Sequence, residues 1–102
     1  MISIIIPTLN ESKTIEATLK NLVSGLKNIS YEIIVSDGNS TDSTVEIARK
    51  YAEVVVYSGH DRQNIAMGKN NGAKIAKYDL LVFLDADVVM FDVENFFKRA
   101  IN

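Results

Sequence analysis

The chain has 102 residues, no cysteine and a formal net charge of −2 at pH 7. This length suits one domain, and a content of 47% hydrophobic and 24% charged residues is typical of a folded globular chain. The balance of charge excludes the basic surface of a nucleic-acid-binding domain, and the lack of cysteine excludes disulfides and thiolate metal sites. The apolar runs are far shorter than the roughly 20 residues that span a bilayer.

The first predicted elements are a strand over residues 2–6 and a helix after it. The opening MISIIIPTLNES has no basic segment and soon turns polar, so we interpret it as this strand and not as a signal peptide. Pro7 predicts the end of the strand, because proline lacks the N–H that a strand ladder needs. Asn10 or Ser12 is expected to cap the helix, and Gly25 to weaken its end. Apolar residues at helical spacing define its inward face: Ile15, Leu19, Leu22, Val23 and Leu26.

The second pair of elements is a strand over residues 32–35 and a helix within residues 40–52. Ser43 and Glu46 have the spacing of a capping box, so the helix is expected to start at Asp42 and Ser43. Its inward residues are Val45, Ala48 and Ala52.

The third pair is a strand over residues 53–57 and a helix over residues 61–77. One side of this helix is expected to face the sheet and carries mostly small residues: Ile65, Gly72, Ala73 and Ala76. Small residues let a helix lie close to a sheet.

The fourth pair is a strand over residues 80–84 and a helix from about residue 92 to the end of the chain. Asp92 is a candidate cap for the helix. Its inward face comprises Val93, Phe96, Phe97, Ala100 and Ile101.

Strands that alternate with helices predict an α/β domain with a parallel sheet and right-handed crossovers. The first and fourth strands are almost continuously apolar, which is typical of strands covered on both faces. The sequence has no internal repeat or linker, so residues 1–102 are interpreted as one domain.

Each predicted strand is followed by a polar or glycine-containing turn. In a parallel sheet these turns lie on one edge, at the carboxyl ends of the strands, where open α/β sheets bind their ligands. We therefore expect Asp37, Asp85 and Asp87 to surround a common crevice.

Asp85 and Asp87 have a spacing that suits a metal. Residues i and i+2 of an extended chain project to the same side, so the two carboxylates can share one hard divalent cation. Such a cation would bridge the protein to a diphosphate and neutralise charge on a leaving group. The alternative is a helix cap or a solvated turn, and the spacing alone leaves both open.

Asp37 precedes Gly38 directly after the second strand and also has two interpretations. Its carboxylate can accept a hydrogen bond from a nucleobase N–H or a ribose hydroxyl, and the glycine lets the backbone approach a ligand closely. An Asp-Gly pair also favours an Asx turn with no ligand role. His60 is interpreted as an ordinary loop residue, and Lys69 as part of a solvated helix face.

The motifs of several enzyme classes are missing from the sequence. It has no G-x-G-x-x-G after the first strand, no G-x-x-x-x-G-K-[ST] and no G-x-S-x-G. These absences argue against dinucleotide oxidoreductases, P-loop enzymes and hydrolases with a nucleophile elbow.

Three segments together resemble the N-terminal half of family 2 glycosyltransferases with the GT-A fold. They are SIIIPTLNES, YEIIVSDGNSTDSTVEIA and LLVFLDADV, and the resemblance runs from residue 2 to about residue 93. Within this family, the segments are most similar to the dolichyl- and polyprenyl-phosphate sugar synthases. The resemblance implies a Rossmann-like half-domain whose four parallel strands are ordered 3-2-1-4.

The resemblance also implies a ligand and the residues that bind it. Family members bind a nucleoside diphosphate sugar in this crevice, with Mg²⁺ or Mn²⁺, and inverting members transfer the sugar to an acceptor such as a polyprenyl phosphate or a saccharide. Asp85 matches an acid that meets ribose or a metal-bound water, and Asp87 matches the acid that meets the metal. Asp37 matches the acid that hydrogen-bonds the base. The nucleotide-binding residues implied are Pro7, Thr8, Asn10, Glu11, Asp37, Arg62 and Asp85, and the metal ligands are Asp85 and Asp87.

This chain departs from the family pattern in its length. Family catalytic domains are about twice as long, and their second half supplies the acceptor pocket and the general base. No residue of this chain is assigned as that base, and we expect donor binding by this chain but not full sugar transfer by this chain alone. The alternative function is therefore a non-catalytic module that binds a nucleotide or a nucleotide sugar. A nucleotidyltransferase is disfavoured, because PTLNESKT lacks the glycine-rich, lysine-bearing signature of that class.

Two further expectations follow from the sheet order and the composition. The fourth strand would lie at an apolar sheet edge, so we expect a homodimer or larger assembly built on that edge or on Phe96 and Phe97. The chain fits a reducing compartment, so we expect a cytoplasmic protein, peripheral at the membrane face where the acceptor is a lipid phosphate.

Overall fold

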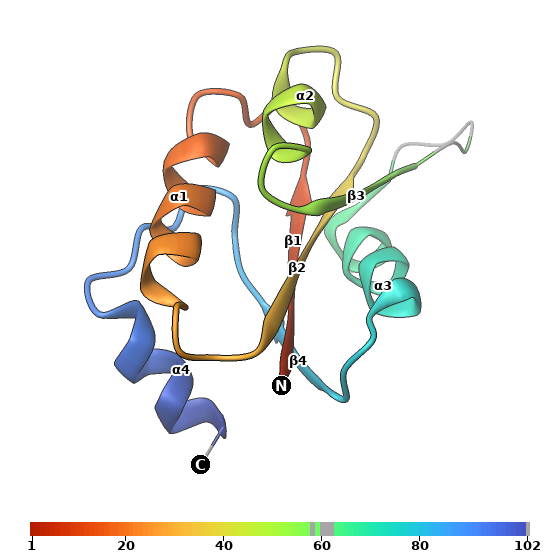
Figure 1. Ribbon diagram of the computed structural model, residues 1–102. Helices are drawn as coiled ribbons and strands as arrows, with labels where there is room; N and C mark the ends of the chain where they lie inside the picture. Colours follow the sequence, from red (N-terminus) through yellow and green to blue (C-terminus); the bar gives the residue numbers. More distant parts are fainter. Residues whose placement is uncertain (58, 60–62, 102) are drawn as a thin grey trace.

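The structure is a computed structural model that describes residues 1–57, 59 and 63–101. Its central sheet has four parallel strands in the order β3-β2-β1-β4, with helices on both faces (Figure 1), so the predicted α/β fold and strand order are confirmed. The elements along the chain are β1 (Ile2–Thr8), α1 (Ile15–Gly25), β2 (Tyr31–Asp37), α2 (Thr44–Ala48), β3 (Glu53–Val56), α3 (Ile65–Ile75), β4 (Leu80–Phe83) and α4 (Val93–Ile101).

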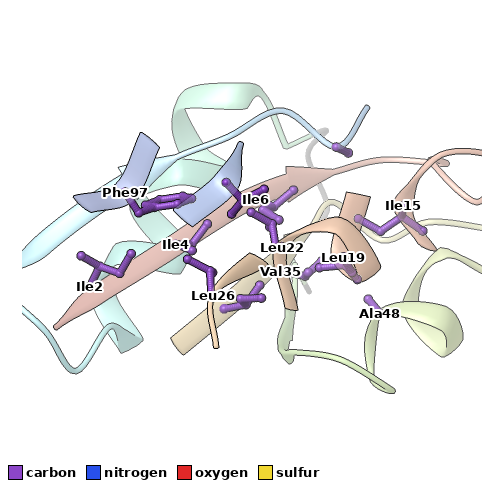
Figure 2. Close-up of a cluster of buried hydrophobic side chains, with 13 residues drawn as sticks. Ile2, Ile4, Ile6, Ile15, Leu19, Leu22, Leu26, Val35, Ala48 and Phe97 are labelled. Atoms are coloured by element: carbon purple, nitrogen blue, oxygen red, sulfur yellow. The ribbon is translucent and has the colours of Figure 1, made fainter. Parts of the chain in front are cut away.

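The main core lies between one face of the sheet and the helices α1 and α4, which cover that face. Helix α3 packs on the opposite face of the sheet, against β1 and β2. Side chains from β1, α1 and α4 meet in this core (Figure 2). Alternate residues of β1 serve the two faces, because successive side chains of a strand point in opposite directions. Ile4 belongs to the α1 side, whereas Ile5 lies beneath α3.

Three apolar residues predicted to face inward are exposed, and these predictions were wrong. Val23 of α1 is 37% exposed, Ile65 of α3 is 68% exposed and Phe96 of α4 is 49% exposed. Their neighbours Leu22 and Phe97 were also predicted to face inward and are buried. Among the described side chains, α1, α3 and α4 thus bury fewer apolar residues than the sequence pattern suggested.

The predicted helix starts also needed correction. The residue at the N-cap of α1 is Thr14 and not Asn10 or Ser12. Ser43 does occupy the N-cap of α2, but its side chain makes no cap hydrogen bond, and the carboxylate of Asp42 accepts from the Thr44 backbone N–H instead (2.9 Å). The third helix begins at Ile65 rather than at residue 61; residues 61 and 62 lie outside the described part of the chain.

The close approach of α3 to the sheet depends on Gly72. A Cβ atom at this position would lie 2.5 Å from Cγ2 of Ile5. We expect Gly72→Ala to lower the free energy of unfolding by about 1–2 kcal/mol, because overpacking exceeds the helix propensity that alanine adds. Urea denaturation measures this change. Asn70→Ala, on the exposed side of α3, is the control and should be neutral or stabilising; equal stability of the two variants would contradict the close contact.

None of the helices in the described part of the chain has both the length and the hydropathy of a bilayer-spanning segment.

Candidate functional site

A crevice opens at the carboxyl edge of the sheet because β4 separates from β1 before β1 ends. The β1–β4 pairing stops at Ile5 and Phe83, whereas β1 stays paired with β2 as far as Thr8 and Asp37. The last bond between β1 and the β4 side runs from Leu84 N–H to the Ile5 carbonyl (3.0 Å).

Pro7 lies where this separation occurs. The prediction that it ends the first strand was wrong, since β1 continues to Thr8. Ile5 directs its carbonyl toward β4 and Thr8 directs its carbonyl toward β2, where it accepts from Gly38 N–H (2.8 Å). By the alternation of a parallel strand, the missing N–H of Pro7 would point toward β4, where no ladder continues. The proline therefore costs no hydrogen bond at this position.

The crevice has a volume of about 890 Å³ and is built from four separate segments. Five of the predicted site residues line it: Pro7, Thr8, Glu11, Asp85 and Asp87. Asn10 and Asp37 do not line it, and Arg62 lies outside the described residues. Gly38, which was expected to let the backbone approach a ligand, also lines the crevice. The other lining residues were not singled out from the sequence as site residues: Leu9, Gln63, Asn64, Ile65, Ala66 and Ala86.

Asp85 and Asp87 reach the crevice by a different route from the predicted one. The strand ends at Phe83, so the two acids do not belong to an extended segment, and that part of the argument was wrong. The chain turns at residues 85–88, where Val88 N–H lies 3.4 Å from the Asp85 carbonyl. Ala86 between the two acids is buried in the main core, and both carboxylates are exposed in the crevice. The turn thus brings both acids to the crevice, and their sharing of a metal ion stays a prediction.

Glu11 completes a group of acids at the crevice. Burial, as the first cause, raises the pKa of the Glu11 carboxyl above its ordinary value. The negative charges of Asp87, Asp42 and Asp85 raise this pKa further, in that order. Within residues 1–57, 59 and 63–101 the two ion pairs lie on α1 and α4 and involve none of these acids. The described part of the crevice is therefore strongly negative, and a cation would relieve the repulsion.

Asp37 is fully buried beneath the loop that follows β2, and it holds that loop together. One carboxylate oxygen accepts from the Thr8 hydroxyl and the Ser40 hydroxyl (both 2.6 Å). The other accepts from the backbone N–H groups of Asn39 (2.9 Å) and Ser40 (2.7 Å). The bond to Asn39 is the predicted Asx turn, and the contact with a nucleobase stays a prediction.

Asn10 ties the loop after β1 to the loop after β2. Its backbone N–H donates to the Ser40 hydroxyl (2.8 Å), and its side-chain oxygen accepts from Thr41 N–H (2.9 Å). Asn10 has φ 54° and Asn39 has φ 76°, in the left-handed region that asparagine tolerates better than most residues. These bonds fix the shape of the crevice wall without placing Asn10 in the crevice.

Asp42 makes a second connection between the same two loops. Its carboxylate accepts from Thr44 and from Ser12 N–H (3.2 Å), and these hydrogen bonds lower the pKa of Asp42 to about 2. This agrees with the prediction that Asp42 lies at the start of the second helix.

Two amides on the α3 side of the crevice had no strong sequence signal. Gln63 accepts a hydrogen bond from the Asn71 side chain (2.9 Å), and Asn64 caps α3 by accepting from Met67 N–H (2.8 Å). Asn64 could have been found as a cap residue before an apolar position, but Gln63 needed knowledge of the fold.

Comparison with known proteins places this architecture among sugar-transferring enzymes. The family model for glycosyl transferase family 2 matches residues 3–101. Validoxylamine A glucosyltransferase of Streptomyces hygroscopicus subsp. jinggangensis is 32% identical over 94 residues, which are 87% of this chain and 22% of that protein.

Two solved structures share the fold over most of this chain. TarS 1–349 of S. aureus, in complex with UDP, superposes with a TM-score of 0.78 at 25% identity and covers 98% of this chain and 31% of its own. The second is glucosyl-3-phosphoglycerate synthase of Mycobacterium tuberculosis, in complex with Mn²⁺, UDP and glucosyl-3-phosphoglycerate. It superposes with a TM-score of 0.73 at 28% identity and covers 84% of this chain and 33% of its own. The chain thus spans about a third or less of the lengths of these relatives.

Proposed function

Because this chain belongs to glycosyl transferase family 2, we propose that its crevice binds a nucleoside diphosphate sugar together with Mg²⁺ or Mn²⁺, for inverting transfer of the sugar to an acceptor. The observation that carries the proposal is the acid-lined crevice at the carboxyl edge, with Glu11, Asp85 and Asp87 on its walls. Support also comes from TarS and glucosyl-3-phosphoglycerate synthase, which share the fold and were solved with UDP.

The acids present fit a metal that the ligand helps to hold. Among the residues that the structure describes, no group of three or more His, Asp or Glu side chains could hold a metal ion. Mg²⁺ is commonly bound by one or two carboxylates, with waters and substrate phosphate oxygens as its other ligands. In our proposal Asp85 and Asp87 are the protein's share of such a site. When bound, the metal would neutralise negative charge on the leaving diphosphate.

The remaining predicted residues have separate parts in the proposal. Pro7, Thr8 and Glu11 form the wall along which the nucleotide lies, and Arg62 supplies a positive charge for the phosphates. Asn10 shapes this wall through its bonds to the loop after β2. Asp37 accepts from four donors already, so it would bind a base N–H only by exchanging a hydroxyl donor for it.

We assign no general base to this chain, and the acceptor remains a polyprenyl phosphate or a saccharide. The alternative is a non-catalytic module that binds a nucleotide or a nucleotide sugar. A cytoplasmic location, at the membrane face for a lipid acceptor, is part of the first proposal.

Calorimetric titration with UDP and GDP, each with Mn²⁺ or with EDTA, tests nucleotide binding. We expect one of the two nucleotides to bind, with higher affinity in Mn²⁺. Absence of binding by both would contradict the proposal. Incubation with the matching nucleotide sugar and an acceptor then separates the two functions, since a transferase forms a glycosylated product and a binding module does not.

We further propose that the outer edge of β4, the last strand of the described sheet, joins two copies of the chain. Leu80 and Phe83 are 38% and 41% exposed there. Leu84 N–H faces β1, so by alternation the backbone N–H groups of Leu81 and Phe83 point outward. Such an edge can pair with a second strand. Light scattering should show a dimer that Leu80→Lys converts to a monomer; a monomeric wild type at high concentration would contradict this.

A further inference from the structure

The turn that carries Asp85 and Asp87 is attached to α1 rather than to the sheet. β4 ends at Phe83, and the chain from residue 84 to residue 92 has no helix or strand. Side chains from α1 reach this segment at two points, 68 and 69 positions away in the sequence. They come from Thr18 and Asn21, which are one helical turn apart.

Thr18 makes the attachment at the middle of the turn. Its side chain is fully buried, and its hydroxyl donates to the carbonyl oxygen of Ala86 (2.7 Å). The same hydroxyl lies 3.2 Å from the Thr14 carbonyl, so the shorter bond goes to the turn. Ala86 is only 4% exposed, with its methyl group in the main core. The residue between the two acids is therefore held by packing and by a buried hydrogen bond.

Asn21 makes the attachment at the end of the segment. Its amide nitrogen donates to the Met90 carbonyl (2.9 Å), and its amide oxygen accepts from Met90 N–H (2.8 Å). One side chain thus satisfies both backbone groups of one residue, as a neighbouring strand would. Together the two attachments hold this segment in place of strand pairing, which ends at Phe83.

The charges of the crevice explain why such an attachment matters. Asp85, Asp87 and Glu11 repel one another, and a loosely held turn would move its acids apart into solvent. The bonds from α1 hold the backbone against this repulsion before a ligand arrives. A site held in its binding geometry loses less free energy to ordering when the ligand binds.

We propose that Thr18 and Asn21 are positioning residues that hold Asp85 and Asp87 for the metal–diphosphate group. This inference rests on the proposed function. Neither residue is among those that line the crevice, so they act through the backbone of the segment that carries the acids. Their loss should weaken metal-dependent nucleotide binding and leave metal-free binding unchanged.

The experiment compares the affinity for the nucleotide that the wild type binds, UDP or GDP, in Mn²⁺ and in EDTA. The ratio of the two dissociation constants is the metal-dependent gain. We expect Thr18→Val to reduce this gain about tenfold, since it removes one buried hydrogen bond while keeping the side-chain shape. Thr18→Ser keeps the hydroxyl and should retain the gain. The affinity in EDTA should be the same for all three proteins, which a general loss of structure would not leave unchanged.

Asn21→Leu keeps the proposal testable if Thr18→Val fails to fold. Asn21 is only partly buried, and we expect this variant to fold, to lose part of the gain and to exchange the Met90 amide hydrogen faster in the absence of metal. Circular dichroism confirms folding of each variant. A full gain in folded Thr18→Val, or in Asn21→Leu where only that variant folds, would overturn the positioning role. A wild type whose affinity does not respond to Mn²⁺ would instead overturn the proposed metal site.

Discussion

Asp87→Asn should lower the affinity for the bound nucleotide in Mn²⁺ by about 100-fold, because it removes half of the protein's proposed share of the metal site. In EDTA the same variant should bind the nucleotide as well as the wild type or slightly better, because one charge that repels the diphosphate is gone. Calorimetry under both conditions gives the two values. A lower affinity in Mn²⁺ without a lower affinity in EDTA distinguishes the loss of a metal ligand from a general loss of structure.

Asp79→Asn is the matched control for this prediction. Asp79 is an exposed acid directly before β4. It therefore lies at the amino ends of the strands, whereas the crevice lies at their carboxyl ends. Its replacement changes the net charge of the protein by the same amount and should leave both affinities unchanged. An unchanged affinity of Asp87→Asn in Mn²⁺ would refute the assignment of Asp87 as a metal ligand.

Asp37→Ala should produce the largest loss of stability, about 4 kcal/mol, because it leaves four hydrogen-bond donors without their common acceptor. Against a total of about 5–15 kcal/mol for a domain, this loss removes much of the stability. The melting temperature should fall by about 20 °C. Thermal and urea unfolding measure the two quantities.

Two further variants rank the contributions to this effect. Asp37→Asn should cost less, since its remaining oxygen can serve the two backbone N–H groups and the hydroxyls of Thr8 and Ser40 can rotate to accept. Thr8→Val removes a single donor and should cost about 1 kcal/mol. A stability of Asp37→Ala within about 0.5 kcal/mol of the wild type would mean that Asp37 does not hold the loop.

The fold could be predicted because its signals are local in the sequence. Apolar runs of strand length alternate with segments of helical period, and this order is enough to specify a parallel sheet. The parts that could not be predicted depend on contacts between distant segments. Val23 and Phe96 fit the helical pattern as well as Leu22 and Phe97 do, and only the final packing decides which residues are buried.

The candidate site was partly predictable for a similar reason. The rule that parallel strands end at one edge brings Thr8 and Asp85 to a common crevice without any knowledge of side-chain contacts. The bonds from Thr18 and Asn21 to the segment after β4 were not predictable, because they join residues that lie 68 and 69 positions apart in the sequence. The crevice residue Gln63 was missed because an isolated glutamine in a loop indicates no function.

Paramagnetic broadening of backbone amide signals by Mn²⁺ tests the central claim most directly. The protein, saturated with the nucleotide that it binds and with Mg²⁺, receives a small amount of Mn²⁺, and the loss of each amide signal is recorded. We predict the strongest losses at residues 85–88 and 8–11, with much weaker losses at Asp79 and the start of β4. Broadening that is centred on α4, or spread evenly over the chain, would contradict a metal–nucleotide site between Asp85 and Asp87.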